Sequence, residues 1–465
     1  MTLIKSISGI RGTIGGKTGE NLTPLDIVKF TSAYATFIKS KNDGKKIKIV
    51  VGRDARISGA MVNNILTSSL VALGIDVVDI GLATTPTTEM AVVFEKAQGG
   101  IIITASHNPK QWNALKLLNE KGEFLNAKEG EEILILAENE AFIYSQVDEL
   151  GKIEQKNYLQ AHIQAILDLP LVDVEAIKKA NFKVAIDCVN SVGGIAIPAL
   201  LNALGVQEVI ELFCEPNGYF PHNPEPLPEN LTEIANLISS STVDLGFVVD
   251  PDVDRLAILD ENGDMFGEEY TLVAVADYVL SHTLGNTVSN LSSSRALRDV
   301  TENKGAIYTA AAVGEVNVVA QMKATNAVIG GEGNGGVIYP DLHYGRDSLV
   351  GIALFLTHLA KTGKTCSQLR ASYPNYFISK NKIELTPDID VDNLLVKMQE
   401  KYTNKVGISV STIDGVKIDF EKEWVHLRKS NTEPIIRIYA ESANEKASMQ
   451  LAEKIITEIK EIVNG

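Results

Sequence analysis

Apolar runs of strand length alternate with polar loops and with stretches of helical periodicity along most of this 465-residue chain. One unit of this pattern, at 47–80, predicts a strand, a polar loop, a helix that ends at Gly74 and a second strand. A second unit, at 184–212, repeats this order with a helix that ends at Gly205. Glycine directly after a periodic segment is typical of a helix stop. The repeat indicates duplicated α/β domains whose Val- and Ile-rich strands are covered on both faces.

The hydrophobic pattern changes from about residue 375 onward. It predicts a strand at 382–385, a helix near 390–401, two further strands and a last amphipathic helix at 443–463. We therefore expect an α/β fold with three similar mixed-sheet α/β domains and a smaller C-terminal α+β domain, because a chain of this length does not form a single core. The expected domain bounds are 1–150, 151–254, 255–373 and 374–465.

The first candidate for chemistry is the serine loop, residues 104–109, with the sequence Thr-Ala-Ser-His-Asn-Pro. It follows the apolar run at 99–103, and Asn-Pro cannot continue a strand, so the pattern predicts a buried strand that ends in a tight turn. A serine at the exposed end of that strand, Ser106, is placed to react. On this segment alone, an ordinary turn is an equally good interpretation.

The second candidate is the acidic loop, residues 250–255, which follows another apolar run at 245–249. It places three carboxylates at alternate positions: Asp250, Asp252 and Asp254. Their mutual repulsion in a cleft calls for a cation, and oxygen ligands favour Mg²⁺ or Ca²⁺ over zinc. The spacing also fits an EF-hand up to Glu261, but Arg255 stands where that loop needs glycine, and a strand precedes it. A phosphate that joins them would explain a positively charged Arg255 next to the cation. The alternative is a solvated acidic turn, which needs neither a cation nor a phosphate.

A third candidate is the glycine-rich loop, residues 331–336, which contains G-x-G-x-x-G. The segment after it, 337–340, predicts a strand rather than the helix of a dinucleotide-binding fold. The loop exposes one carboxylate and one amide, Glu332 and Asn334, which suit the hydroxyls of a sugar. A plain hairpin turn is the alternative.

The fourth candidate is the basic loop, residues 428–434, which precedes a strand-like run at 435–439. Cationic side chains, hydroxyls and turn amides concentrated within a few residues suit a phosphate group. A solvated basic turn is the alternative. The candidate phosphate ligands are Arg428, Ser430, Asn431 and Thr432.

These four loops occur in the order and at the spacing of the α-D-phosphohexomutase family, which the chain resembles over its whole length. The resemblance implies four domains around one central cleft and a phosphorylated Ser106. It implies that Mg²⁺ is held by Ser106, Asp250, Asp252 and Asp254. Arg11, in the motif Ser-Gly-Ile-Arg-Gly, and Lys116, ten residues past Ser106, match family positions for active-site contact and proton transfer. His107 and Arg255 complete the expected catalytic set.

The implied reaction moves a phosphoryl group between O6 and O1 of a hexose phosphate, through phosphorylated Ser106 and a hexose 1,6-bisphosphate that also serves as activator. The N-terminal motif resembles phosphoglucosamine mutases, so we expect conversion of glucosamine 6-phosphate to glucosamine 1-phosphate. However, Asn431 resembles phosphomannomutases, and Asn334 and Gly336 replace the serine and histidine of many bacterial members. A phosphomannomutase/phosphoglucomutase of broad sugar specificity is therefore the alternative enzyme.

Two other classes of function fit the four loops less well. A Mg²⁺-dependent phosphatase would use Ser106 but would not need the sugar and phosphate loops. A non-catalytic sugar-phosphate-binding protein would not need the complete set of serine, aspartates and arginine.

Composition and charge limit the partners and the cellular location that we expect. The formal net charge of −16 argues against nucleic acid as a partner. No apolar run approaches the roughly 18 residues of a membrane span, and the N-terminal residues show no signal pattern. The three cysteines lack metal or disulfide spacing. We expect a cytoplasmic enzyme without membrane association, a monomer or homodimer, whose partner is a small hexose phosphate.

Overall fold

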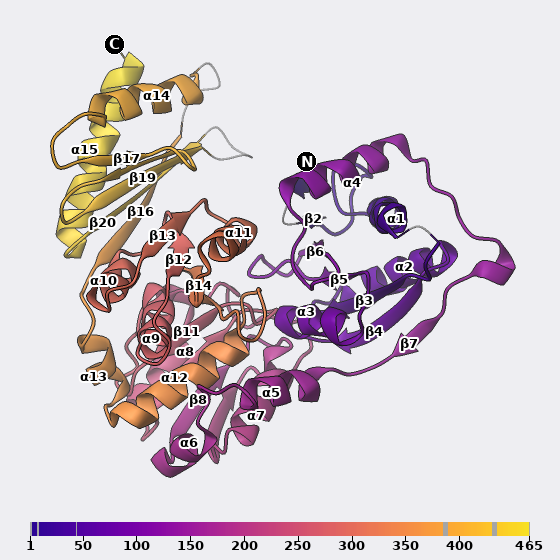
Figure 1. Ribbon diagram of the computed structural model, residues 1–465, viewed down its shortest axis with the longest axis horizontal. Helices are drawn as coiled ribbons and strands as arrows, with labels where there is room; N and C mark the ends of the chain where they lie inside the picture. Colours follow the sequence, from indigo (N-terminus) through magenta and orange to yellow (C-terminus); the bar gives the residue numbers. More distant parts are fainter. Residues whose placement is uncertain (1, 7–8, 43, 385–388, 430–434, 465) are drawn as a thin grey trace. The chain divides into compact units, whose positions relative to one another are not determined.

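The computed structural model describes residues 2–6, 9–42, 44–384, 389–429 and 435–464 (Figure 1). The chain forms two compact units. The first consists of Met1–Tyr278 with Asn334–Leu369, and the second of Val279–Gly333 with Arg370–Gly465.

The first sheet of unit 1 has seven strands in the order β1-β2-β6-β5-β3-β4-β7. Strands β5, β3, β4 and β7 are parallel to one another, and β1, β2 and β6 continue the sheet with antiparallel pairs. The strands are β1 (Ile4–Ser6), β2 (Gly9–Thr13), β3 (Lys48–Arg53), β4 (Asp76–Leu82), β5 (Gly99–Ile103), β6 (Trp112–Leu118) and β7 (Ile153–Gln155). The accompanying helices are α1 (Pro24–Lys41), α2 (Gly59–Ala72), α3 (Thr85–Phe94) and α4 (Ala127–Asn139).

Both faces of this sheet are buried, which explains the continuous apolar runs in its central strands. On β3, Ile49 and Val51 belong to one core cluster, and Val50 between them belongs to a second. Alternate side chains of a strand point to opposite faces, so each run supplies both cores. Helix α3 contributes Ala91 and Val92 to the second core.

The second sheet of unit 1 has the order β11-β10-β8-β9, in which only the β10–β11 pair is antiparallel. Its strands are β8 (Lys183–Asp187), β9 (Glu208–Leu212), β10 (Leu245–Val249) and β11 (Leu256–Leu259). The helices that follow α4 along the chain are α5 (Leu159–Leu167), α6 (Val174–Ala180), α7 (Gly193–Ala203), α8 (Thr232–Ser239) and α9 (Glu268–Leu280). Unit 1 also includes β15 (Gly336–Ile338) and α12 (Ser348–Thr362), which is followed by α13 (Cys366–Ala371).

Unit 2 contains the strands of a third sheet in the order β13-β12-β14, all parallel, and a five-stranded antiparallel sheet in the order β16-β20-β19-β18-β17. The parallel strands are β12 (Thr287–Asn290), β13 (Tyr308–Ala311) and β14 (Ile329–Glu332), with helices α10 (Ala296–Asn303) and α11 (Glu315–Thr325). The antiparallel strands are β16 (Phe377–Glu384), β17 (Ser409–Ser411), β18 (Val416–Asp419), β19 (Trp424–Lys429) and β20 (Ile435–Ser442), with helices α14 (Val391–Tyr402) and α15 (Glu445–Asn464).

The predicted fold class, three α/β domains followed by a smaller C-terminal α+β domain, is confirmed. One detail of the last domain was wrong. Two strands were expected between its helices, and the structure has four there. Strands β17 and β18 are three and four residues long and contain polar residues, so their periodicity is too short to recognise in the sequence.

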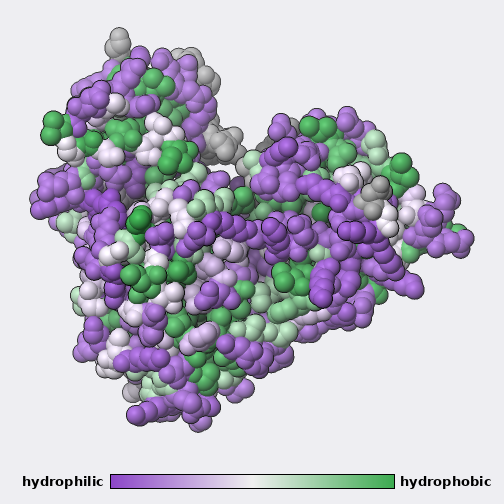
Figure 2. All heavy atoms as spheres, in the orientation of Figure 1, coloured by the Kyte–Doolittle hydropathy of each residue, from purple (hydrophilic) through white to green (hydrophobic). Residues whose placement is uncertain are grey.

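Polar residues cover most of the face in Figure 2, and apolar residues form separate small patches on it. Among the described helices, none combines the length and the apolar character that a membrane crossing requires.

Candidate active site

Ser106 lies on the turn that follows β5, as the sequence predicted. Its φ of 48° is in the left-handed region, which is uncommon for a residue other than glycine and recurs at functional sites. The expectation of an exposed side chain was wrong, because Ser106 is only 8% exposed. Its hydroxyl donates a hydrogen bond to Asp250 Oδ2 at 2.7 Å, and its backbone N–H donates to Thr104 Oγ1 at 3.0 Å. The turn therefore points the serine inward, at the acidic loop.

A buried ion pair that the sequence pattern did not predict holds this turn from beneath the serine loop. Arg56 and Asp54 are both fully buried, and Arg56 Nε lies 3.0 Å from Asp54 Oδ2. The same carboxylate accepts the Thr104 hydroxyl at 2.7 Å. The remaining guanidinium donors reach four backbone carbonyls, those of Ser106, Asn108, Pro109 and Trp112. Burial raises the pKa of Asp54, and the charge of Arg56 opposes that rise.

The acidic loop follows β10 and brings its three carboxylates together. Asp250, Asp252 and Asp254 are fully buried, and each offers an oxygen within 4.8 Å of the others. Asp252 Oδ1 and Asp254 Oδ1 are buried without a hydrogen-bond partner. Between them Val253 has a φ of 64°, a strained value for a β-branched residue. Buried carboxylate oxygens that lack donors fit a hard divalent cation such as Mg²⁺.

Two cationic side chains and a hydroxyl balance these carboxylates. Lys116 Nζ, on β6, lies 2.7 Å from Asp252 Oδ2 and 3.6 Å from Asp254 Oδ2. Arg346 Nη2 lies 2.6 Å from Asp254 Oδ2, and the Thr85 hydroxyl donates to Asp252 Oδ2 at 2.6 Å.

These contacts determine how the acidic loop ionises. Burial disfavours the charged form of Asp252, but Lys116 and Thr85 hold its pKa well below the ordinary value. Burial and the neighbouring Asp252 and Asp254 raise the pKa of Asp250. Burial would also lower the pKa of Lys116, but the two aspartates raise it, so its ammonium group stays charged.

The remaining predicted catalytic residues of unit 1 are His107, Arg255 and Arg11. His107 Nδ1 is 3.4 Å from Ser106 Oγ, and burial together with Arg255 lowers the pKa of His107 to about 2, so the imidazole is neutral. The backbone N–H of Arg255 donates to Asp250 Oδ1 at 3.2 Å, and its guanidinium lies 3.4 Å from Glu225. Arg11 lies on β2, which pairs with the strand that carries Lys116.

The sequence as a whole matches known proteins. Four models described as phosphoglucomutase/phosphomannomutase domains I, II and III and C-terminal domain match residues 3–143, 158–263, 267–376 and 388–458. A phosphoglucomutase/phosphomannomutase of Thermococcus kodakarensis is 36% identical over 98% of this chain and 99% of its own length. The chain belongs to the phosphoglucomutase/phosphomannomutase family. It is accordingly an enzyme of the phosphohexomutase class.

Other members of this family are similar to the chain over almost their full length. A phosphoglucosamine/phosphogalactosamine mutase of Sulfurisphaera tokodaii is 34% identical over 98% of each protein. The solved structure of a phosphoglucomutase/phosphomannomutase family protein from Burkholderia thailandensis has a TM-score of 0.85 at 25% identity, with 100% of this chain and 99% of that chain covered. A putative phosphomannomutase from Thermus thermophilus has the same fold, with a TM-score of 0.82 at 24% identity and 100% of both chains covered.

In the glycine-rich loop, Gly336 lies against the side chain of Arg346. A Cβ at Gly336 would collide with the side chain of Arg346. The absence of a Cβ at this position therefore leaves room for the arginine that pairs with Asp254. Asn334 Oδ1 accepts the Gly336 N–H at 3.2 Å and shapes the turn. Arg346 was not among the predicted site residues, because it lies 92 residues from its partner in the sequence.

In unit 2, the predicted sugar ligand Glu332 and the predicted phosphate ligand Arg428 both contact polar groups of the same unit. Glu332 ends β14 and is 4% exposed, and its Oε1 accepts from Asn290 Nδ2 at 2.9 Å and from Gly314 N–H at 3.1 Å. Arg428 lies on β19, where its Nε is 2.9 Å from Asp414 Oδ2. Three predicted phosphate ligands lie outside the described residues: Ser430, Asn431 and Thr432.

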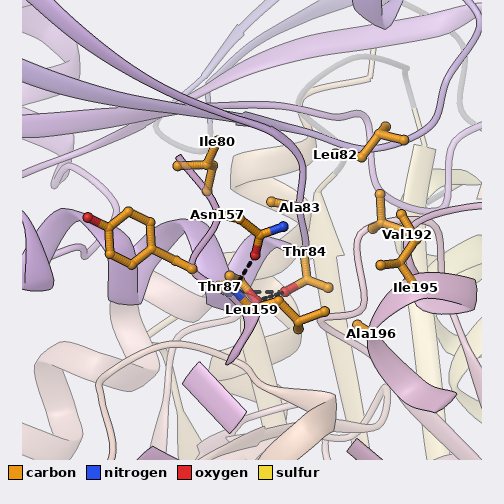
Figure 3. Close-up of a pocket in the computed structure, with 11 residues that line it drawn as sticks. Ile80, Leu82, Ala83, Thr84, Thr87, Asn157, Leu159, Val192, Ile195 and Ala196 are labelled. Carbon is orange, nitrogen blue, oxygen red and sulfur yellow. Dashed lines mark hydrogen bonds between the residues drawn. The ribbon is translucent and has the colours of Figure 1, made fainter. Parts of the chain in front are cut away.

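A small pocket in unit 1 shares no lining residue with this site (Figure 3). Most of its wall is apolar, and Tyr158 is the single titratable side chain in that wall. Such a lining does not suit a phosphate or a metal ion. The lining residues are Ile80, Leu82, Ala83, Thr84, Thr87, Asn157, Tyr158, Leu159, Val192, Ile195 and Ala196.

Proposed function

We propose that this chain moves a phosphoryl group between O6 and O1 of a hexose phosphate, with Ser106 as the phosphoryl carrier and a hexose 1,6-bisphosphate as intermediate. The observation that carries the proposal is the 2.7 Å hydrogen bond from Ser106 Oγ to Asp250 within a buried set of three carboxylates. A serine aimed at such a set is suited to carry a phosphoryl group next to a cation.

Mg²⁺ would be held by Asp250, Asp252, Asp254 and a phosphoryl oxygen on Ser106. When bound, it would neutralise the charge of the phosphoryl oxygens. The protein's own contribution is to fix these ligands, which the inward turn at Ser106 and the contacts of Lys116 and Arg346 accomplish.

Transfer begins when the free hydroxyl of the sugar phosphate attacks the phosphorus on Ser106. The bond from that hydroxyl oxygen to phosphorus forms as the bond from phosphorus to Ser106 Oγ breaks. The proton of the attacking hydroxyl ends on the serine oxygen as that bond breaks, and neutral His107 lies beside its path, 3.4 Å from Ser106 Oγ. Lys116, whose ammonium group stays charged, supplies a positive charge for the transferring group. The second half of the cycle is the reverse transfer, after the bisphosphate has turned over.

The remaining predicted residues would bind the sugar phosphate. Glu332 and Asn334 would accept hydrogen bonds from ring hydroxyls, and Arg11 and Arg255 would contact phosphate oxygens. The non-transferring phosphate would lie on Arg428, Ser430, Asn431 and Thr432.

We propose glucosamine phosphate as the preferred substrate. The N-terminal Ser-Gly-Ile-Arg motif supports it, and so do relatives named for glucosamine phosphates in Sulfurisphaera tokodaii and, as a probable phosphoglucosamine mutase 30% identical to this chain, in Methanopyrus kandleri. A phosphomannomutase/phosphoglucomutase is the second candidate, because the relative from Thermococcus kodakarensis carries that name at 36% identity.

The test combines one substitution with one substrate comparison. Ser106→Ala should lose mutase activity by several orders of magnitude and lose the phosphate that intact-mass spectrometry detects on bisphosphate-treated wild type. Ser69→Ala is the matched control. Ser69 is also 8% exposed, but its hydroxyl donates a hydrogen bond to a backbone carbonyl within α2. Wild-type turnover by Ser106→Ala would contradict the mechanism. A tenfold preference for mannose or glucose phosphate over glucosamine phosphate, about 1.4 kcal/mol, would select the second candidate.

A further inference from the structure

A second group of metal-ligating side chains lies in unit 1, outside the acidic loop. His162 Nε2 and His343 Nε2 lie 2.9 Å and 3.3 Å from Asp347 Oδ2. The three residues each offer a ligating atom, and these atoms are within 4.8 Å of one another. The side chains of His162 and Asp347 are fully buried, and that of His343 is 9% exposed. We propose that His162, His343 and Asp347 bind a divalent transition metal ion of the Zn²⁺ type.

The far nitrogen of each imidazole also faces a side-chain oxygen, as in protein metal sites. His162 Nδ1 lies 3.0 Å from Thr87 Oγ1, and His343 Nδ1 lies 3.4 Å from Glu89 Oε2. Metal-binding histidines usually donate their second N–H to an oxygen, which fixes the ring and turns the other nitrogen toward the ion. Thr87 is itself fixed by a 2.7 Å hydrogen bond with Thr84, drawn in Figure 3.

The backbone near His343 is adapted to this arrangement. A Cβ at Gly345 would collide with the carboxylate of Glu89. Glycine at this position therefore allows Glu89, which is 2% exposed, to approach the loop that carries His343 and Asp347. Burying a carboxylate against an imidazole costs free energy, which is unexpected in a segment whose only role is to connect two elements.

The donor set selects the ion. Two imidazole nitrogens and one carboxylate oxygen suit Zn²⁺ and its neighbours in the first transition row, whereas the three carboxylates of the acidic loop suit Mg²⁺. Three protein ligands leave a fourth position for water. A metal ion binds both Nε2 atoms only when they are unprotonated. Each neutral imidazole then carries its proton on Nδ1, which faces Thr87 in one case and Glu89 in the other.

The site would connect three separate segments of unit 1. His162 is on α5, and Thr87 and Glu89 are on α3. Asp347 caps α12, where its Oδ1 accepts hydrogen bonds from the N–H groups of Leu349 and Val350. The same segments reach the acidic loop through residues that lie one or two positions away in the sequence. Thr85 donates to Asp252, and Arg346 pairs with Asp254. A metal ion here would hold both of those contacts in place.

The test is a Co²⁺ titration of the chelator-treated full-length protein, followed by visible absorption. Wild type should bind one equivalent with the intense bands of low-coordinate Co²⁺, and Zn²⁺ should displace it and raise the Tm. Glu89→Gln should weaken Co²⁺ binding about 10–100-fold, and His343→Ala should remove the bands. His222→Ala is the matched control, since His222 also pairs with an aspartate, Asp187, at 3.0 Å and lies outside the cluster.

The titration decides between a metal site and a purely hydrogen-bonded cluster. Absence of the bands in wild type, or their retention in His343→Ala, would overturn the proposal. Unchanged affinity in Glu89→Gln would overturn it as well, and this variant carries the test should His343→Ala not fold. Asp250→Asn separates the two sites, because it disables the acidic loop and should leave the Co²⁺ bands unchanged.

Discussion

Replacing Arg56 tests whether a buried ion pair positions the serine loop. In Arg56→Met, Asp54 is left fully buried without its counter-charge, and four carbonyls of the segment 106–112 lose their donors. Removing one partner of a buried pair costs about 3–5 kcal/mol. The carbonyls add roughly 1 kcal/mol each where water does not replace the guanidinium. We expect the free energy of unfolding to fall by about 4–6 kcal/mol at pH 7, and kcat to fall with it because the loop loses its support.

The pH dependence of this loss identifies its cause. Without Arg56, Asp54 can remain buried only by taking up a proton, so its folded-state pKa, which burial already raises in wild type, rises further above the unfolded value of about 3.9. At pH 7 that uptake costs about 4 kcal/mol, and the cost falls by about 1.4 kcal/mol for each unit of acidification toward pH 4. The sign follows because the folded variant then binds one proton more than the unfolded chain. The extra destabilisation should therefore shrink by about 2.7 kcal/mol between pH 7 and pH 5.

The matched control is the double variant Arg56→Met/Asp54→Asn, which removes both charges. It should be more stable than Arg56→Met at pH 7 and should lack the extra pH dependence, as urea denaturation of both variants and wild type at pH 7 and pH 5 would measure. The reasoning is refuted if the single variant is as stable as the double variant at pH 7. It is also refuted if the destabilisation of the single variant does not change with pH.

Two further predictions concern stability in each unit. Gly335→Ala should destabilise unit 1 clearly more than Gly19→Ala, for which about 1–2 kcal/mol is expected. Both glycines have φ near +80°, but only a Cβ at Gly335 would strike a backbone oxygen, that of Leu256, so equal losses in urea denaturation would contradict the collision. In unit 2, burial together with Lys417 lowers the pKa of His426 to about 4, which means that stability is lost as pH falls below about 6.5. The loss should be about 2 kcal/mol at pH 5, and His426→Gln, compared by denaturation at pH 8 and pH 5, should lack it.

The parts of the site that the sequence predicted are those set by local pattern. The apolar runs at 99–103 and 245–249 coincide with β5 and β10, because strands buried on both faces need continuous apolar residues. The serine and acidic loops follow directly, so their positions at strand ends were predictable. That both loops meet at one edge was an expectation from family resemblance, and the Ser106–Asp250 contact joins residues 144 positions apart.

The residues that were missed depend on contacts between distant segments. Arg56 was assigned to an ordinary loop, since nothing in its neighbourhood reveals that its donors reach carbonyls some 50 positions away. Thr85 and Asp252 are 167 positions apart, and Arg346 and Asp254 are 92 apart. Hydrophobic periodicity reports which face of an element is buried but not which polar side chains pair across elements. The inward direction of Ser106 was missed for the same reason, because it depends on the left-handed turn and on its acceptor.

The charges around the acidic loop indicate how a cation and a phosphoryl group can enter a buried site together. Three carboxylates face two cations, Lys116 and Arg346, both within 4 Å of the loop's oxygens. A phosphorylated Ser106 would add close to two negative charges at neutral pH, and a divalent cation adds two positive ones. The pair is therefore nearly neutral, and the site keeps its balance when both are present, whereas either one alone leaves a buried charge without compensation. In the proposed mechanism this balance fits an arrangement in which the protein's own cations pair with Asp252 and Asp254 while the serine hydroxyl faces Asp250, where a phosphoryl group on Ser106 and the ion would meet.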